Sequence, residues 1–234
     1  MAEIGIMGGT FDPIHNGHLL LGRQAYLEYG LDQVWFMPSA VPPHKKDHIV
    51  TAGKDRIKMV SLAVEKYPYF LCSDFEMKRQ GNTYTAETLR LLREQYPAHR
   101  FYFIIGADSL YQIENWYHPS KVMEQAVLLV ANREYEQAPC PIKDQITYLQ
   151  KQYGADIRIL HCKEVDISSG ELREMAMQGM ELCQYIPKCV EDYIHFHKLY
   201  QNPCGYTHEH AYLPKDGGML ADHLTHGYKG GQDA

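Results

Sequence analysis

Residues 8–18 combine residue types that can bind a phosphate group and stabilise charge on it. The run reads GGTFDPIHNGH. Gly8 and Gly9 let a backbone turn tightly and approach a ligand, and free N–H groups at the start of a helix attract anions. His15 and His18 are three residues apart, so at a helix start they face the same way and can donate hydrogen bonds to phosphate oxygens. Their positive character would stabilise the charge that develops on a phosphoryl group during transfer.

Each part of this run also has an ordinary structural interpretation. A pair of glycines is usually only a turn, and a histidine near a helix start usually has a structural role. A zinc site would need a third ligand, and none stands nearby in the sequence. The run matches neither the GxGxxG dinucleotide motif nor a Walker A loop. The combination of glycines, threonine and both histidines in one continuous run favours a phosphate site.

A second run, residues 167–173, has a similar potential. It reads ISSGELR. Ser168 or Ser169 suits the N-cap position of a helix, and Arg173 stands one turn further on. Hydroxyl groups, helix N–H groups and an arginine together form an anion site. Taken alone such a run is usually a capped helix, but beside the first run it indicates a second phosphate contact.

The elements that must position these runs alternate along the chain. Apolar stretches predict strands at residues 3–7, 34–37, 70–73, 101–105, 127–131 and 157–160, and helical patterns cover residues 17–29, 54–67, 85–96, 142–153, 169–178 and 188–200. Apolar strands alternating with helices indicate an α/β fold, a Rossmann-like doubly wound parallel sheet with helices on both faces. We expect one domain over residues 1–200, with ligands bound beyond the carboxyl ends of the strands.

The first run resembles the signature of the nucleotidyltransferase superfamily with the His-x-Gly-His motif. Its GTFDP portion resembles the bacterial nicotinate-nucleotide adenylyltransferases in particular, and SSGELR is similar to their Ser-Ser-Thr-x-Ile-Arg signature, with Gly170 at the usual threonine position. The resemblance implies that His15, His18 and Arg173 are catalytic and contact the ATP phosphates. It also implies a nucleotide site formed by Gly8, Gly9, Thr10, Phe11, Gly106, Asp108, Ser168 and Ser169, with Asp108 on the ribose.

Four further segments bear on the acceptor substrate: PPHKK at residues 42–46, NTYTAETL at residues 82–89, GADSL at residues 106–110 and the pair Trp116-Tyr117. Each segment also has an ordinary interpretation: a solvated charge run for residues 42–46, helix capping for residues 82–89 and 106–110, and a core aromatic for Trp116-Tyr117. The resemblance, which spans most of residues 3–200, implies that Trp116 stacks on a pyridine ring. It implies that Thr85 and the backbone N–H of Tyr117 hold the carboxylate of that ring. Lys45 and Arg133 would lie near the acceptor phosphate.

The implied reaction joins the AMP part of ATP to nicotinate mononucleotide and releases pyrophosphate, a step of NAD biosynthesis. Mg²⁺ would be held by substrate phosphates and water, without a metal site on the protein. A pantetheine-phosphate adenylyltransferase or a cytidylyltransferase would share the first motif. Two other classes stay open: a nucleotide-binding regulator without turnover, and an interaction module carried by the C-terminal residues.

Composition narrows the class of partner. The 234 residues include 23 basic and 29 acidic side chains, a net charge of −6, which argues against nonspecific nucleic-acid binding. No apolar run is long enough to cross a membrane, and no secretion leader is evident. Six cysteines without a Cys-x-x-Cys pair predict buried free thiols in a reducing compartment, so we expect a cytoplasmic protein.

The C-terminal stretch differs from the rest of the sequence. Residues 201–234 are rich in Gly, His, Asp and Lys without periodicity, which predicts a flexible tail. Its four histidines and Cys204 could bind a metal, but incidental histidines in a polar tail are the more common case. The sequence does not determine the oligomeric state, and a homo-oligomer stays open.

Overall fold

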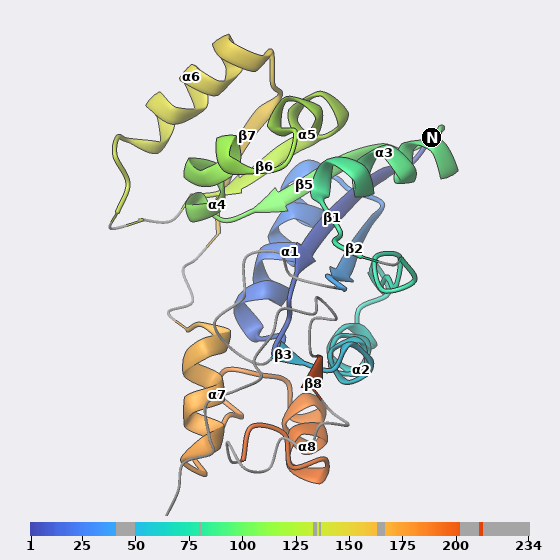
Figure 1. Cartoon of the computed structure of the whole chain (residues 1–234), viewed down its shortest axis with the longest axis vertical. Coiled ribbons are helices and arrows are strands. Elements are labelled where there is room, and N and C mark those ends of the chain that lie inside the picture. Colours follow the sequence, from blue (N-terminus) through green and yellow to red (C-terminus); the bar gives the residue numbers. More distant parts are fainter. Residues whose placement is uncertain are drawn as a thin grey trace, which may run out of the picture.

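The computed structural model describes residues 1–40, 50–79, 81–132, 135, 137–162, 167–201 and 211–212. Its centre is a six-stranded parallel sheet in the order β4-β2-β1-β5-β6-β7 (Figure 1). These strands are β1 (Glu3–Gly9), β2 (Gln33–Pro38), β4 (Phe70–Cys72), β5 (Arg100–Ile105), β6 (Val127–Ala131) and β7 (Ile157–Leu160). The order is that of a doubly wound Rossmann-like sheet, which confirms the predicted fold class.

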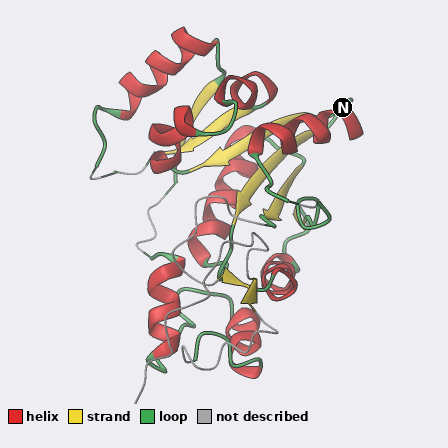
Figure 2. Ribbon diagram, viewed as in Figure 1, coloured by secondary structure: helices red, strands yellow, loops and turns green. Residues whose placement is uncertain are grey.

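Helices cover both faces of the sheet (Figure 2). The helices are α1 (Asn16–Tyr29), α2 (Gly53–Val64), α3 (Thr85–Gln95), α4 (Ala107–Gln112), α5 (Pro119–Gln125), α6 (Ile142–Tyr153), α7 (Ser169–Met177) and α8 (Lys188–Phe196), with one 3₁₀ turn, η1 (Ile113–Asn115). The buried side chains of α1, α2, α7 and α8 belong to one hydrophobic cluster, and those of α3, α4, α5 and α6 to another. Two apolar layers therefore enclose the sheet.

Strand β1 shows why the sheet is buried on both sides. Ile4 and Ile6 pack in the cluster of α3–α6, whereas Met7 packs in the cluster of α1 and α2. Successive side chains of a strand point to opposite faces, so a strand apolar at nearly every position needs cover on both. Helices α7 and α8 lie beyond the end at which β1 finishes (Figure 1).

Several predicted boundaries match, and others differ for physical reasons. Strands β6 and β7 and helix α6 have the predicted limits, and Gly30 ends α1 in the left-handed conformation. Helix α2 stops at Val64 instead of residue 67, because Pro68 disfavours helical geometry at the residue before it. Helix α8 stops at Phe196 instead of residue 200. The chain turns there through Lys198 (φ 52°) and Tyr200 (φ 63°), which returns Tyr200 to the core.

A small second sheet pairs β3 (Val50–Thr51) with β8 (Ala211–Tyr212). Apart from Gln201 and β8, the predicted tail over residues 201–234, including Cys204 and the four histidines, lies outside the described residues. The expectation of buried thiols was wrong for the described cysteines: Cys183 and Cys189 are exposed, and Cys72, Cys140 and Cys162 are only partly buried. None of the five described cysteines forms a disulfide bond.

Candidate active site

A cavity of about 650 Å³ opens at the carboxyl ends of the central strands β1 and β5. Strand order reverses between these two neighbours, which is where ligands bind in doubly wound sheets. The predicted site residues that line the cavity are Gly8, Gly9, Thr10, His15, His18, Thr85, Gly106, Asp108, Trp116, Tyr117, Ser168 and Ser169. Segments far apart in the sequence thus share one space.

The two histidines form a pair at the start of α1. His15 is the N-cap residue, and its backbone N–H donates a hydrogen bond to Nδ1 of His18 at 3.2 Å. The ring centroids are 3.7 Å apart, and the edge of Phe11 packs on the His18 ring with centroids 5.0 Å apart. Because Nδ1 accepts a hydrogen bond, a neutral His18 carries its proton on Nε2. The sequence thus places a donor of fixed tautomer at the helix start.

The glycine pair acts differently from the sequence expectation of a tight turn. Gly8 and Gly9 finish β1 in extended backbone, paired with Met37 and Pro38. The turn falls instead on Phe11, whose φ is 50°. A Cβ on Gly9 would lie 3.1 Å from the Phe11 ring, so Gly9 is needed for close packing there. Phe11 itself is buried beneath the loop and does not line the cavity, contrary to the implied nucleotide contact.

The second motif is bonded to the first. Ser168 caps α7 by accepting a hydrogen bond from the Glu171 N–H at 3.2 Å, and its own N–H donates to the Glu171 carboxylate at 2.7 Å. The Ser169 hydroxyl donates to the carbonyl oxygen of Pro13 at 2.9 Å, across 156 residues of sequence. The helix starts of α1 and α7 therefore border the same cavity.

Arg173 connects the first run, residues 8–18, to the second run, residues 167–173, through hydrogen bonds to the backbone of both. Its Nη1 donates to the carbonyl oxygens of Asp12 at 2.8 Å and Ser169 at 3.1 Å. Arg173 is absent from the cavity lining among the described residues. The structure therefore gives this predicted catalytic residue a second task, since it holds the first loop against α7.

A buried polar network that the sequence analysis did not predict supports the first loop. The Asp12 carboxylate accepts hydrogen bonds from the Tyr200 hydroxyl at 2.6 Å and the Thr51 N–H at 3.2 Å. Arg56 donates to the carbonyl oxygens of Thr51 at 2.8 Å and Thr10 at 2.7 Å. Burial lowers the pKa of Arg56, while the charge of Asp12 acts in the opposite direction. Asp12 stood in the motif, but no local signal marked Arg56 or Tyr200.

The opposite wall of the cavity is aromatic. Trp116 follows η1 and packs edge-on against Phe103 of β5, with ring centroids 6.2 Å apart. Tyr84 and Tyr117 stack with their centroids 4.4 Å apart, and Tyr117 is 51% exposed. Thr85 opens α3, whose N-cap Tyr84 makes no side-chain capping bond. This wall offers flat apolar surface beside hydroxyl and backbone donors.

Three buried polar residues also line the cavity: Glu76, Thr83 and Thr88. The two threonines belong to the segment NTYTAETL that the sequence singled out, whereas Glu76 was missed. The Thr88 hydroxyl donates to a Glu76 oxygen at 2.7 Å and accepts a hydrogen bond from Arg79 at 2.8 Å. Burial raises the pKa of Glu76, and the hydrogen bond from Thr88 acts against that rise. A turn after a short strand gives no periodic signal, so nothing in the sequence marked Glu76.

Positive charge along the described wall is sparse. No lysine or arginine appears among the described residues that line the cavity, so its cationic character comes from His15, His18 and helix N-termini. The predicted acceptor-phosphate residues Lys45 and Arg133 lie outside the described residues. No group of three His, Cys, Asp or Glu side chains in the described part of the chain could hold a metal ion. Within that same part, no helix is both long and apolar enough to cross a membrane.

Comparisons with known proteins show which family the chain belongs to. The family model described as Cytidylyltransferase-like matches residues 6–175. The "Probable nicotinate-nucleotide adenylyltransferase" of Lachnoclostridium phytofermentans is 40% identical over 200 residues, which are 86% of this chain and 100% of the relative. The protein of the same name from Carboxydothermus hydrogenoformans is 36% identical over 200 residues, 86% of this chain and 98% of the relative.

A solved structure shares the fold. It is titled "Plasmodium falciparum nicotinic acid mononucleotide adenylyltransferase complexed with NaAD" and matches with a TM-score of 0.70 at 21% identity. The match covers 86% of this chain and 98% of that chain. A second structure of the Plasmodium falciparum enzyme, complexed with APC, matches with a TM-score of 0.68 over the same share of this chain.

Proposed function

Because the chain belongs to the cytidylyltransferase-like family and, within it, to the nicotinate-nucleotide adenylyltransferases, we propose that it transfers the adenylyl group of ATP to nicotinate mononucleotide. The products are nicotinate adenine dinucleotide and pyrophosphate, in NAD biosynthesis. The observation that carries the proposal is the meeting of two anion-binding helix starts at one cavity, joined by the bond from Ser169 to Pro13.

The reaction is a displacement at phosphorus. A phosphate oxygen of the acceptor forms a bond to the α-phosphorus of ATP, and the bond from that phosphorus to the oxygen bridging to the β-phosphate breaks. The electron pair leaves with pyrophosphate. Phosphoryl transfer of this kind needs positioning and charge neutralisation and no protein nucleophile. The structure supports that division of labour, since the described motifs supply donors around the cavity.

His18 is suited to the bridging or terminal phosphate oxygens that gain charge. Its Nδ1 is occupied by the His15 N–H, so Nε2 is the atom that donates. A donor fixed in this way needs no reorganisation as charge develops, which is the basis of preorganised electrostatic catalysis. His15, Ser168 and Ser169 add donors on the same side, with Thr10 and the backbone of Gly8 and Gly9 along the triphosphate and Gly106 and Asp108 at the nucleoside.

Mg²⁺ would enter with ATP, coordinated by phosphate oxygens and water. Magnesium keeps several waters and is commonly bound through substrate phosphates, which suits a wall without a carboxylate cluster. When bound, it neutralises phosphate charge. On the protein, that task falls to His15 and His18, and by resemblance to Arg173, Lys45 and Arg133.

The acceptor is assigned to the aromatic wall. Trp116 would stack on the pyridine ring, and Thr85 with the Tyr117 N–H would hold the carboxylate. A site of donors binds a carboxylate well and leaves the NH₂ group of the matching amide without an acceptor. The half-buried ring of Trp116, braced by Phe103, supports this assignment.

We assign residues 1–200 to a single catalytic domain. The five described cysteines form no disulfide bond, which suits a reducing compartment, so we propose that the protein acts in the cytoplasm. The net charge of −6 suits small-molecule partners rather than nucleic acid.

The test is a pyrophosphate-release assay with ATP and Mg²⁺. Nicotinate mononucleotide, nicotinamide mononucleotide and phosphopantetheine are offered in turn, and CTP replaces ATP in a parallel series. We expect release with ATP and the two pyridine nucleotides, faster with the acid. Release only with phosphopantetheine, or only with CTP, would contradict the assignment, and no release with any pair would indicate a binding protein.

A further inference from the structure

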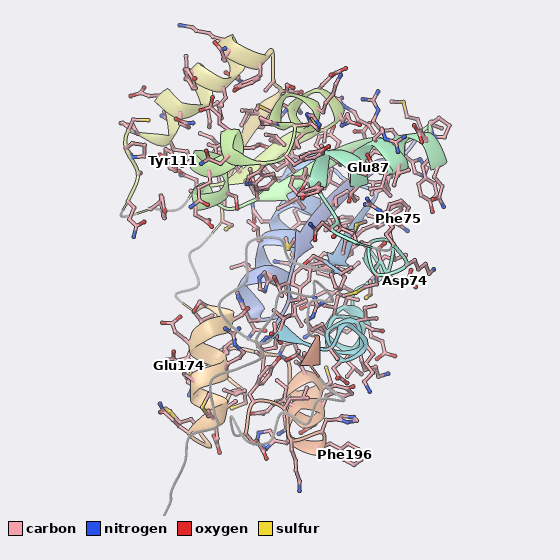
Figure 3. All side chains as sticks on the ribbon, in the orientation of Figure 1. Asp74, Phe75, Glu87, Tyr111, Glu174 and Phe196 are labelled. Carbon is pink, nitrogen blue, oxygen red and sulfur yellow. The ribbon has the colours of Figure 1, made fainter. Side chains whose placement is uncertain are left out.

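One buried carboxyl group in the cavity wall takes no part in the reaction as described. Glu76 lies in the turn between β4 and α3, directly after Asp74 and Phe75, which Figure 3 labels. It lines the cavity and is only 8% exposed. A buried carboxyl on the wall of a site for anionic substrates is electrostatically unfavourable when ionised, so its presence calls for a physical account.

The contacts of Glu76 place it in the acceptor half of the cavity. Its Oε1 accepts the hydroxyl proton of Thr88 at 2.7 Å. Thr88 stands three residues after Thr85 on α3, and both line the cavity, as expected of positions one turn apart on one helix face. Glu76 is therefore bonded to the helix turn on which the acceptor carboxylate would be held.

The surrounding charges bias its protonation. Burial is the largest cause and raises the pKa of Glu76, whereas hydrogen bonding with Thr88 and Thr83 and the nearby charge of Arg79 lower it. Several other charged groups of the turn and of α3 are paired with one another at the surface. Lys78 is bonded to Asp74 at 2.9 Å, and Arg90 to Glu87 at 2.7 Å. Glu76 thus keeps its proton to a higher pH than an exposed glutamate does.

We propose that Glu76 sets how strongly the acceptor site prefers a carboxylate over an amide. A neutral Glu76 carboxyl does not repel the acceptor carboxylate and can donate a hydrogen bond towards it. An ionised Glu76 repels that carboxylate and can accept a hydrogen bond from an amide N–H. This inference rests on the proposed function and adds to it the residue that tunes acceptor choice.

The experiment measures the ratio of kcat/KM for nicotinate mononucleotide to kcat/KM for nicotinamide mononucleotide across a pH series from mildly acidic to mildly alkaline. Both acceptors carry the same ribose phosphate, so its titration and those of the two histidines cancel in the ratio. In the wild type we expect the ratio to fall as pH rises through the pKa of Glu76. Glu76→Gln should hold the ratio at the low-pH value, roughly fivefold above the wild type at high pH, the size of a like-charge repulsion across a solvent-exposed cavity.

Two further variants sharpen the test. Thr88→Val removes the donor that stabilises the ionised carboxylate, so the fall in the ratio should move to higher pH. Glu87→Gln neutralises a partly exposed carboxylate on α3 that lies near Thr88 in the sequence (Figure 3). This variant should show the same dependence of the ratio on pH as the wild type. The KM for ATP and the melting temperature are measured for each variant.

The possible outcomes distinguish a failure of the role proposed for Glu76 from a failure of the proposed reaction. A Glu76→Gln ratio that follows the wild type at every pH, or falls below it, would overturn the role of Glu76 while leaving the reaction intact. Equal losses with both acceptors would reduce Glu76 to a structural residue and also overturn it. A wild type that turns over neither acceptor would refute the proposed function itself.

Discussion

The proposed assignment divides the cavity into a nucleotide half, around the first loop and the start of α7, and an acceptor half, around Trp116 and Tyr117, and the two are built in different ways. In the nucleotide half, the first loop is bonded through its own backbone: Arg56 holds the Thr10 carbonyl, Arg173 the Asp12 carbonyl and Ser169 the Pro13 carbonyl. The acceptor half is assembled from side chains on separate elements, with Trp116 after η1 and Tyr84 before α3. In the nucleotide half, the backbone of the first loop is therefore held by several side-chain hydrogen bonds. The acceptor half, by contrast, includes a half-exposed tyrosine, Tyr117.

This difference fits the demands of the reaction. Charge develops on phosphate oxygens during transfer, so donors must be preorganised there, and buried bonds to the backbone achieve this. The acceptor ring undergoes no chemistry and needs only affinity and selection, which stacking and a few polar contacts supply. We therefore expect changes in the nucleotide half to reduce turnover or stability, and changes in the acceptor half to alter acceptor binding.

The largest effect should come from His18. His18→Ala removes the donor whose tautomer the His15 N–H defines, and kcat should fall roughly a hundred- to a thousandfold, as for loss of one preorganised oxyanion donor. The melting temperature should change little, because the ring lies at the cavity surface. Steady-state kinetics with saturating substrates measure this. Near-normal turnover would remove His18 from the mechanism.

Arg56 should matter most for folding. Arg56→Met leaves the carbonyl groups of Thr10 and Thr51 without their donors and the Asp12 carboxylate without its buried countercharge. The free energy of unfolding should fall by about 3 kcal/mol, the usual cost of breaking a buried ionic contact from one side. Urea denaturation gives this value. Tyr200→Phe, which removes one hydrogen bond to Asp12, is the matched control and should cost about 1 kcal/mol.

Trp116 tests the acceptor half. Trp116→Ala should raise the KM for nicotinate mononucleotide roughly tenfold, in line with about 1–3 kcal/mol for stacking a base on an aromatic ring. The KM for ATP and kcat should change by much less. If the KM for the acceptor stayed constant while that for ATP rose, the two halves of the cavity would have been assigned the wrong way round.

The smallest effect should come from the cap of α7. Ser168→Ala removes the acceptor of the Glu171 N–H and should cost about 1 kcal/mol of stability, with a modest rise in the KM for ATP. Gly170→Ala is the control, because a Cβ there meets the Ser168 hydroxyl at an ordinary contact distance of 3.5 Å. Thermal unfolding should show a lower melting temperature for the serine variant alone.

Local patterns in the sequence predicted much of this molecule. Apolar runs located all six strands of the main sheet, because a parallel strand covered on both faces is apolar at nearly every position. Helices α4 and α5 were missed, since segments of six and seven residues are too short for helical periodicity to show. Of the predicted site residues, those that follow β1 and β5, Phe11 excepted, line the cavity because strand ends in such a sheet meet at one edge.

The sequence by itself determined features whose cause lies within a few residues: the apolar strands, a serine cap at residue 168 or 169, and the histidine pair at a helix start. Only the tertiary structure decided that Arg173 braces the first loop, that Phe11 lies beneath it, and that Glu76 lines the cavity. Those roles come from hydrogen bonds and packing between segments far apart in the chain, such as Arg173 with Asp12. Such contacts leave no periodic or local trace, because each partner alone is compatible with many other folds.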